Sequence, residues 1–334
     1  MKFPPFHILD KGEDMKRRII VLICLICMLI LQAEAETIKW VDFNVPYESL
    51  KYAMYADIGT SEQENHISWI SILAIAGCRT GGRCDLRSVV RAKNELSDGK
   101  SPQEILGDLY KYYDYYYNAY SAVLGGLLGH YTLEMNGEQT EQYGLKAYSP
   151  IAEGYGYSHC SDFGNSRSFG FARKHLGNDL MGALGTPIIA VEGGIVEAMG
   201  WNRYGGWRIG IRSYDSKRYY YYAHLQKDKP FAKDLAVGDI VQAGDLVGFM
   251  GRTGYSDKEN TNNIETVHLH FGMQLIFDEN QKECTNEIWV DVYPIVRLLN
   301  THRSTIERTD TGWFRPYKFE DLDVENFVEK IEEK

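Results

Sequence analysis

The spacing of apolar residues changes once along the chain, between its first third and its second half. Residues 36–135 carry apolar side chains at helical spacing, as in PYESLKYAM and HISWISILAIAG. Over residues 150–300, short β-type runs alternate with glycine turns, which is typical of an antiparallel β domain. The pattern therefore predicts a multidomain α and β chain. An N-terminal helical region is followed by an antiparallel β-sandwich or barrel-like domain.

The segments that flank the β domain have weaker patterns. Residues 136–149 contain Gly137 and Gly144 and little apolar periodicity, which indicates a linker. Residues 301–334 end in the acidic run FEDLDVENFVEKIEEK. We expect an acidic C-terminal tail there, in the form of a solvated helix.

One helix start in the helical region is well marked. In the run from Ser101 to Glu104, Ser can cap the helix, Pro suits its first position and Glu can close a capping box. This helix is expected to run into the tyrosines at 110–120 and to end near Gly125. The region contains no catalytic group of side chains. A targeting module, a spacer and an inhibitory pro-region all remain open.

The run ETVHLHFGMQ, residues 265–274, alternates apolar and polar positions as a β-strand does. His268 and His270 would then project from one face, and Val267, Leu269 and Phe271 from the other. If the apolar side chains pack into the core, the two histidine side chains face a cleft. The alternative is a half-exposed strand with two incidental histidines.

The N-terminus has the three parts of a secretory signal. Lys16–Arg18 is basic, Ile19–Leu31 is uninterrupted and apolar, and Ala33–Ala35 fits a cleavage site. Because the apolar stretch is short for a membrane span, we expect residues 1–35 to be a signal peptide, with an uncleaved anchor as the alternative. The protein is then expected to be secreted or to lie in the cell envelope. It would meet the membrane only through this segment.

Charge and composition narrow the range of possible binding partners. The formal net charge is -10 and there is no basic stripe, which argues against nucleic acid. Tyrosine is abundant at 24 residues, with dense runs at 110–120 and 219–222. Tyrosine suits interfaces and sugar-stacking surfaces, but it also fills cores and strands. The oligomeric state is left open.

Four cysteines remain after the predicted signal. An even number in an exported chain permits disulfides. Pairing Cys78 with Cys84, and Cys160 with Cys284, is one of three connectivities. None of the four forms a Cys-x-x-Cys pair, so a four-cysteine zinc site is not expected.

Five polar side chains of the β domain fit a metal centre. His175 and Asp179 stand in RKHLGNDLMG, His224 ends YYYYAH, and His268 and His270 follow. Catalytic zinc sites use three nitrogen or oxygen ligands and leave a fourth position for water. His175, Asp179 and one of the last two histidines would supply those ligands. The other imidazoles would handle protons or stabilise an oxyanion. Taken singly, each residue is more often a surface, turn or strand residue.

The β domain resembles the lysostaphin-type (LytM-like) zinc metallopeptidases, which cut peptide bonds in bacterial peptidoglycan. The resemblance covers about Pro150 to Leu299. It rests, in family order, on HLGND, GTPIIAVEGGIVEAMG, YYAHL, VGDIVQAGDLVGFMGRTGYS and HLHF. It implies a zinc metalloendopeptidase acting on the stem or cross-bridge peptides of peptidoglycan through a zinc-activated water.

The resemblance also implies roles for the five residues. His175, Asp179 and His270 are the expected ligands of one Zn²⁺ per chain. His224 and His268 are the expected non-ligand histidines, which polarise the attacking water and stabilise the tetrahedral intermediate. One departure from the family is the insertion of eleven residues, 257–267, where a short Gly-Pro link is usual. It puts the shape of the cleft wall in doubt.

Three other functions are compatible with parts of the sequence. A biotinyl or lipoyl carrier shares the VGDIVQAGDLVG turn pattern, but Gly200 stands where the carrier needs its modified lysine. A catalytically silent envelope protein could use the same fold, although such relatives typically lack some of the five residues. A zinc amidase that cuts another peptidoglycan bond would use the same metal chemistry.

Overall fold

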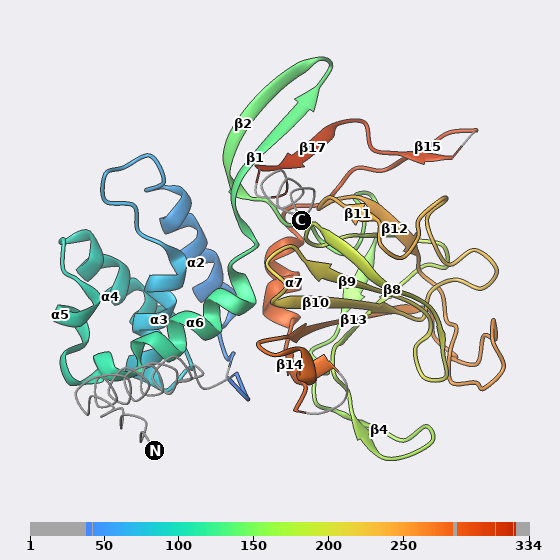
Figure 1. Ribbon diagram of the computed structural model, residues 1–334, viewed down its shortest axis with the longest axis horizontal. Coiled ribbons are helices and arrows are strands. Elements are labelled where there is room, and N and C mark those ends of the chain that lie inside the picture. Colours follow the sequence, from blue (N-terminus) through green and yellow to red (C-terminus); the bar gives the residue numbers. More distant parts are fainter. Residues whose placement is uncertain (1–37, 42, 283–285, 311, 323, 325–334) are drawn as a thin grey trace, which may run out of the picture. The chain divides into compact units, whose positions relative to one another are not determined.

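The computed structural model describes residues 38–41, 43–282, 286–310, 312–322 and 324 (Figure 1). The described residues from Trp40 onward form one compact unit, to which every element below belongs. The predicted signal peptide lies outside the described residues. Within the described ranges, no helix has the length and apolar character that crossing a membrane requires.

The helical region is built around one buried helix. Most side chains of α3, from Trp69 to Cys78, are buried, and α3 packs against α2, α4, α5 and α6. Serine and aspartate cap two of these helices, since Ser68 accepts a hydrogen bond from Ile70 N and Asp85 accepts one from Ser88 N. The elements are α2 (Tyr47–Ile58), α3 (Trp69–Thr80), α4 (Leu86–Ser97), α5 (Pro102–Leu106), the 3₁₀ helix η1 (Gly107–Tyr112) and α6 (Tyr113–Leu124).

The predicted capping box at Ser101 and Glu104 is present at the start of α5. The helix is shorter than predicted because Gly107, with a φ of 54°, ends it after five residues. The tyrosine run therefore begins in η1 and continues in α6, which ends at Leu124, near the predicted position.

The expectation of helix up to residue 135 followed by a linker at 136–149 is wrong. Residues Leu128–Met135 form strand β1 and Glu138–Leu145 form strand β2. Asn136 and Gly137 join them with φ values of 56° and 81°, as a two-residue hairpin turn requires. The signal was the Asn-Gly pair. The apolar pattern does not reveal this hairpin, because β2 is mostly exposed and polar and lacks apolar alternation.

The main sheet is antiparallel and has eight strands in the order β11-β8-β9-β10-β13-β6-β3, with β14 also paired to β13. This agrees with the predicted antiparallel β domain. Its strands are β3 (Tyr157–His159), β6 (Asn178–Gly182), β8 (Gly194–Asn202), β9 (Gly206–Ser213), β10 (Arg218–Ala223), β11 (Ile240–Val241), β13 (His268–Leu275) and β14 (Ile288–Val290). Shorter elements complete the domain: β4 (Ser166–Arg167) with β5 (Arg173–Lys174), β7 (Pro187–Ile189) with β12 (Leu246–Phe249), the 3₁₀ helix η2 (Glu279–Lys282) and α7 (Tyr293–Leu299).

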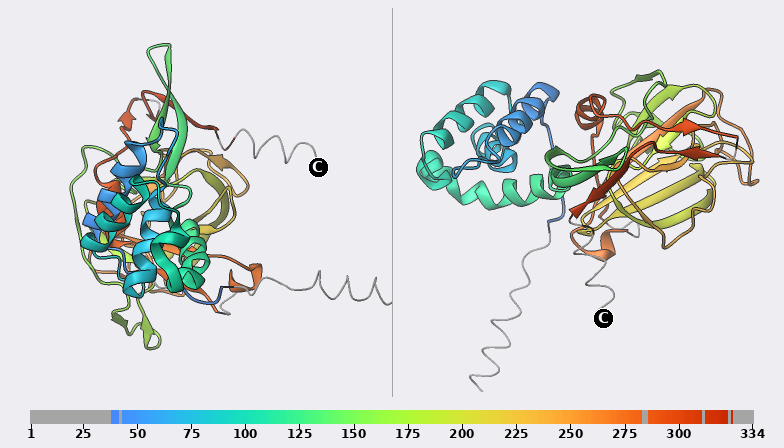
Figure 2. Two further views of the ribbon diagram at one scale, coloured as in Figure 1. Left: turned by 90° about the vertical axis from the view of Figure 1, so that its left-hand side faces the viewer. Right: turned by 90° about the horizontal axis from the view of Figure 1, so that it is seen from above.

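The expectation of a solvated helical tail at 301–334 is wrong as far as Asp321, although Leu322 and Val324 are helical. Residues 307–321 form β15 (Glu307–Arg308), β16 (Trp313–Phe314) and β17 (Lys318–Asp321), and β17 pairs with β1 (Figure 2). The return is held by Phe319, which is buried, and by Asp321, whose carboxylate lies 2.8 Å from the Lys146 ammonium. The acidic character of this segment does not reveal that Phe319 is buried or that Asp321 forms a buried ion pair. Residues 325–334 lie outside the described residues.

A buried arginine joins the helical region to the main sheet. Arg218 of β10 donates to the carbonyl oxygen of Ala122 in α6 at 2.8 Å. Its guanidinium also forms two bonds of 2.8 and 2.9 Å with Glu192 and one of 2.9 Å with Asp215. The Tyr220 hydroxyl donates to Glu192 at 2.6 Å. The charges of this buried group are thus matched within the described part of the chain.

The predicted Cys78–Cys84 disulfide is not formed. Cys78 is a free thiol, and the Cys84 sulfur contacts the Tyr120 hydroxyl at 3.3 Å inside the helical core. Burial raises the pKa of the Cys78 thiol to about 11. The other predicted pair includes Cys284, which lies outside the described residues.

Candidate metal centre

The predicted strand around the two late histidines is β13, at the centre of the main sheet. Leu269 and Phe271 are fully buried in the core, and His268 and His270 point to the opposite face. The neighbouring strand β6 is antiparallel and places Asp179 directly opposite His270. Strand pairing therefore brings together two side chains that are 91 residues apart.

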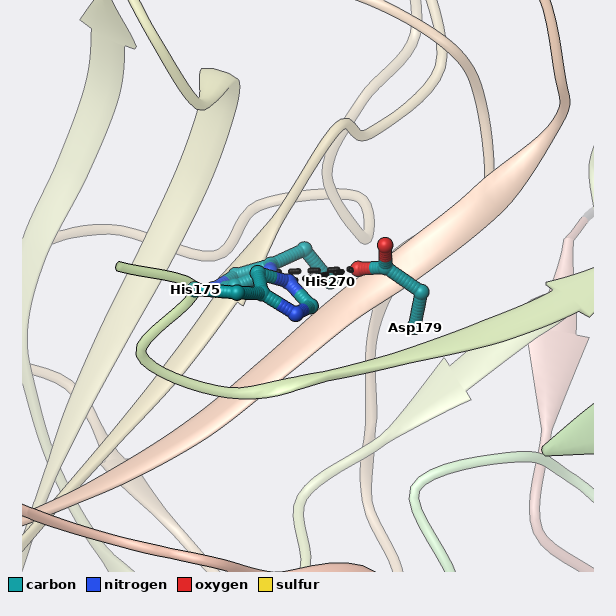
Figure 3. A group of neighbouring side chains, drawn as sticks. All are labelled: His175, Asp179 and His270. Atoms are coloured by element: carbon teal, nitrogen blue, oxygen red, sulfur yellow. Dashed lines mark hydrogen bonds and ion pairs between the residues drawn. The ribbon is translucent and has the colours of Figure 1, made fainter. Parts of the chain in front are cut away.

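His175 completes a triangle of possible ligand atoms (Figure 3). Its Nε2 lies 2.7 Å from His270 Nδ1 and 3.0 Å from Asp179 Oδ1, and the last two atoms are 3.2 Å apart. His175, Asp179 and His270 are the group of described residues that could hold a metal ion. The ligand atoms of tetrahedral zinc, at about 2.0–2.1 Å from the metal, lie about 3.3 Å from one another. The triangle is only slightly tighter, and its donors are of the type zinc prefers.

A glycine makes this close approach feasible. A Cβ added at Gly177 would lie 2.6 Å from the carbonyl oxygen of Phe271 and 2.8 Å from Cε1 of His270. Neither atom can retreat without moving β13 or the imidazole. Glycine between His175 and Asp179 is thus required by packing.

Two further residues hold the triangle, and the sequence analysis missed both. Nδ1 of His175 lies 3.1 Å from both the carbonyl and a carboxylate oxygen of Asp162, which can accept its proton. Arg167 donates to Asp162 at 2.8 Å and to Oδ2 of Asp179 at 3.0 Å, on the side away from the triangle. Such partners orient metal ligands. No sequence motif marks these two residues. Asp162 lies in an irregular segment and Arg167 in the two-residue strand β4, and neither segment has a periodic pattern.

His224 and His268 lie beside the triangle with the same arrangement of partners. Nδ1 of His224 is 2.9 Å from the carbonyl oxygen of Thr253, and Nδ1 of His268 is 2.9 Å from that of Thr266. Each carbonyl accepts the Nδ1 proton, so each Nε2 keeps a free lone pair. The two rings are 4.8 Å apart, and Nε2 of His268 is 3.7 Å from Asp179 Oδ1. His224 has a φ of 61°, a strained value for a non-glycine residue.

The electrostatics favour the neutral forms of His224 and His270 beside an ionised Asp179. Burial alone would raise the pKa of Asp179, but hydrogen bonds from His175 and His270 outweigh it and hold that pKa far below its usual range. Burial, together with the neighbouring His268 and His270, lowers the pKa of His224 well below its usual value. Burial also lowers the pKa of His270. Metal ligation and proton acceptance both need this neutral form.

Residues 173–284 match the model of peptidase family M23. The chain contains a peptidase family M23 domain. The matched range includes His175, Asp179, His224, His268 and His270. The chain matches the "L-Ala--D-Glu endopeptidase" of Bacillus subtilis (strain 168), with 39% identity over 141 residues, which are 42% of this chain and 40% of the relative. It also matches "Lysostaphin" of Staphylococcus staphylolyticus, with 37% identity over 98 residues, which are 29% of this chain and 18% of the relative.

These matches span less than half of either curated relative. A solved structure of a protein named lytM from Ruminococcus gnavus ATCC 29149 superposes with a TM-score of 0.53 at 24% identity, covering 78% of this chain and 89% of that one. The two chains therefore share a fold over most of their length.

The triangle of the M23 domain opens into a groove of about 680 Å³. No residue of the described helical region lines this groove, and neither does any residue of the 257–267 insertion. The insertion folds elsewhere, with the Asn260 side chain bonded to Trp207 at 2.9 Å and to Asp228 at 2.6 Å. The groove is lined by Arg167, Arg173, Lys174, His175, Leu176, Asp179, Glu197, Ala198, Asn202, Tyr204, Gly205, Arg208, Tyr219, Tyr221, His224, Tyr255, His268, His270, Gln274, Lys282, Glu287 and Trp289.

Proposed function

We propose that the M23 domain is a zinc endopeptidase that hydrolyses peptide bonds of cell-wall peptidoglycan, in its stem or cross-bridge peptides. The observation that supports this most directly is the triangle of His175, Asp179 and His270, with two further imidazoles directed at it. The names of the two curated relatives are consistent with this substrate class. The protein would then act outside the cytoplasm, where its substrate lies.

Nε2 of His175, Oδ1 of Asp179 and Nδ1 of His270 would hold one Zn²⁺. Two imidazole nitrogens and one carboxylate oxygen form a donor set that leaves a fourth position open. When bound, zinc supplies a Lewis acid and lowers the pKa of a coordinated water to about 7. Asp162 and Arg167 would keep the ligand side chains in register, since they bond the outer atoms of His175 and Asp179.

His224 and His268 would carry the protons. Because Thr253 and Thr266 accept the Nδ1 protons, each Nε2 can take a proton from the attacking water. The protonated ring then becomes a donor, which can stabilise negative charge on the substrate oxygen and protonate the leaving amine. The lowered pKa of His224 keeps this residue neutral and ready to accept at neutral pH.

The test uses the chain without its predicted signal peptide, together with purified cross-linked peptidoglycan, with and without a zinc chelator. We expect new free amines that disappear with the chelator, and fragments whose masses identify the bond. Protein that contains one zinc per chain but releases no amines would contradict the proposal. Release of whole stem peptides from the glycan would instead indicate an amidase.

The ligand assignment has its own test. His270→Ala should lose both zinc, measured by metal analysis, and activity. His302→Ala is the matched control, because His302 stacks on Tyr148 away from the groove and should keep both. Retention of a full zinc equivalent by His270→Ala would contradict the assignment.

A further inference from the structure

The groove floor extends beyond the metal ligands across two strands. β10 places Ala223 opposite His270, and the pairing of Tyr222 with Ile209 puts Arg208 of β9 beside Ala223. Tyr222 and Ile209 face the core, so the next residue on each strand faces the groove, which Arg208 lines. Two strand spacings of about 4.8 Å put the Arg208 backbone about 10 Å from that of His270.

Most charged side chains of the groove are matched by a partner. Arg167 pairs with Asp162 and Asp179, and Lys282 pairs with Glu197. Arg173 donates to the Phe169 carbonyl and the Tyr255 hydroxyl and lies over the rings of Tyr204 and Tyr255.

Arg208 and Lys174 differ from these, since neither side chain makes an ion pair or hydrogen bond with any residue that the structure describes. Lys174 is exposed at the rim, whereas Arg208 lies on the floor and is only half-exposed. Of the acidic lining residues within the described ranges, only Glu287 lacks a cationic partner, and it accepts a hydrogen bond from Trp289. The groove therefore carries more positive than negative unmatched charge.

The Tyr219 hydroxyl is a second group without a partner at the same place. It lies over Gly210, where an added Cβ would collide with it, and it makes no hydrogen bond with a described residue. Burial raises the pKa of Tyr219, with Arg208 opposing the effect, so the hydroxyl stays protonated and can donate. The Tyr221 hydroxyl, in contrast, accepts a hydrogen bond from Asn202 at 3.1 Å.

We propose that Arg208 and Tyr219 form a carboxylate-binding subsite that selects peptides with an acidic group close to the scissile bond. A guanidinium offers two parallel donors to a carboxylate, and the hydroxyl adds a third. An extended peptide advances about 3.3 Å per residue, so the 10 Å separation and the reach of arginine place the acidic group within about three residues of the cut. This inference rests on the proposed function and specifies its substrate as an anionic peptide.

The test compares two isosteric substrates within each protein. They are N-acetyl-L-Ala-γ-D-Glu-L-Lys with a free α-carboxylate on D-Glu, and the same peptide with that group as a carboxamide. We expect the wild-type zinc protein to prefer the carboxylate by roughly 10- to 100-fold in kcat/KM, as for loss of a charge-assisted hydrogen bond. Arg208→Gln should bring the ratio close to one. Tyr219→Phe should reduce it in part, and Arg208→Lys should restore it in part.

Lys174→Gln is the matched control, because it removes the same charge from the exposed rim of the groove and should keep the preference. Because the ratio is taken within each protein, a variant of lower overall activity still reports it. Equal cleavage of both peptides by the wild type, or an unchanged preference in Arg208→Gln, would overturn the subsite.

Failure of the peptidase proposal gives a different result. If neither peptide is cut, the same ratio is measured from dissociation constants by calorimetry. A carboxylate preference in binding that Arg208→Gln abolishes would support the subsite, and the digestion of cross-linked peptidoglycan would then decide the peptidase proposal separately. Absence of that preference in binding would overturn the subsite as well.

Discussion

The four consecutive tyrosines of β10 lie on one strand but serve two different surfaces. Tyr220 and Tyr222 are fully buried, and their hydroxyls donate to Glu192 at 2.6 Å and accept from Val191 N at 2.9 Å. Tyr219 and Tyr221 lie on the other face and line the groove. Strand alternation alone sends identical residues to these two environments.

Polar side chains on the buried face and on the groove face differ in whether they have partners within the protein. On the buried face, the guanidinium of Arg218 is bonded to Glu192, Asp215 and Ala122, so a buried charge is fully matched. On the groove face, Arg208 and the Tyr219 hydroxyl have no partner in the described chain, and two imidazoles keep free lone pairs. Matched polar groups stabilise the fold, whereas unmatched ones on a groove are available to a ligand.

The largest effect expected on the groove face is that of His268→Ala. Removing a positioned proton acceptor should lower kcat by about 10²- to 10⁴-fold while zinc remains bound. Its free energy of unfolding should change by less than about 1 kcal/mol, since His268 makes one hydrogen bond to a backbone carbonyl. Peptidoglycan digestion, metal analysis and urea unfolding measure the three quantities. Loss of zinc together with activity would make His268 a ligand instead.

The corresponding change on the buried face is Arg218→Ala. It leaves Glu192 buried without its cation and should lower the free energy of unfolding by about 3–5 kcal/mol. Arg208→Ala removes the same side chain from the groove face and should change stability by only about 0.5 kcal/mol. Urea unfolding of the two variants decides the matter. Similar losses in both would remove the distinction between the faces.

A smaller and cleaner comparison uses two tyrosines of the same strand. Tyr220→Phe deletes the donor to a buried carboxylate and should cost about 1.5–3 kcal/mol of stability. Tyr219→Phe deletes a hydroxyl without a partner in the described chain and should be neutral within about 0.5 kcal/mol. Thermal and urea unfolding should agree on this order. A larger loss in Tyr219→Phe would show that its hydroxyl has a structural role.

The smallest expected effect concerns a histidine on the buried face, His159 of β3. The centre of its ring lies 4.5 Å from that of Tyr293, with the two rings tilted, and its nitrogens have no hydrogen-bond partner in the described chain. Burial, with a contribution from Arg297, lowers its pKa from 6.5 to about 4. As the pH falls below about 6.5, the unfolded chain binds this proton before the folded protein does, so stability is lost toward pH 4. We expect a loss of about 1–2 kcal/mol between pH 7 and pH 5.

His159→Gln, which does not titrate, is the matched control for that pH dependence. Urea unfolding at both pH values should show a smaller loss in this variant than in the wild type. Equal losses would assign the acid sensitivity to other groups.

The sequence predicted the parts of the site that follow from a short period. Alternation in residues 265–274 gave strand β13 and the shared face of His268 and His270, and the structure has both. The choice of His175, Asp179 and His270 as ligands came from the resemblance, because alternation cannot rank two histidines on one face. Their atoms do lie within hydrogen-bonding distance of one another, although the binding of zinc stays a prediction.

What the sequence did not predict depends on contacts between distant segments. Asp162 and Arg167 reach the ligands from an irregular segment with no periodicity. Arg208 is separated from His270 by an entire strand, so its place in the groove appears only once the sheet order is known. The β1–β2 hairpin was missed for the opposite reason, since its Asn136-Gly137 turn was visible but its strands are too polar to alternate.

The pairing of β17 with β1 has a consequence for producing the M23 domain as a separate fragment. Residues 318–321 complete the sheet begun by residues 128–145, and Asp321 neutralises the buried Lys146. A fragment of residues 150–300 would lack both partners of that ion pair. It would also lack the Ala122 carbonyl of α6, to which the buried Arg218 donates. A fragment that keeps all of these contacts extends from α6 through at least Asp321.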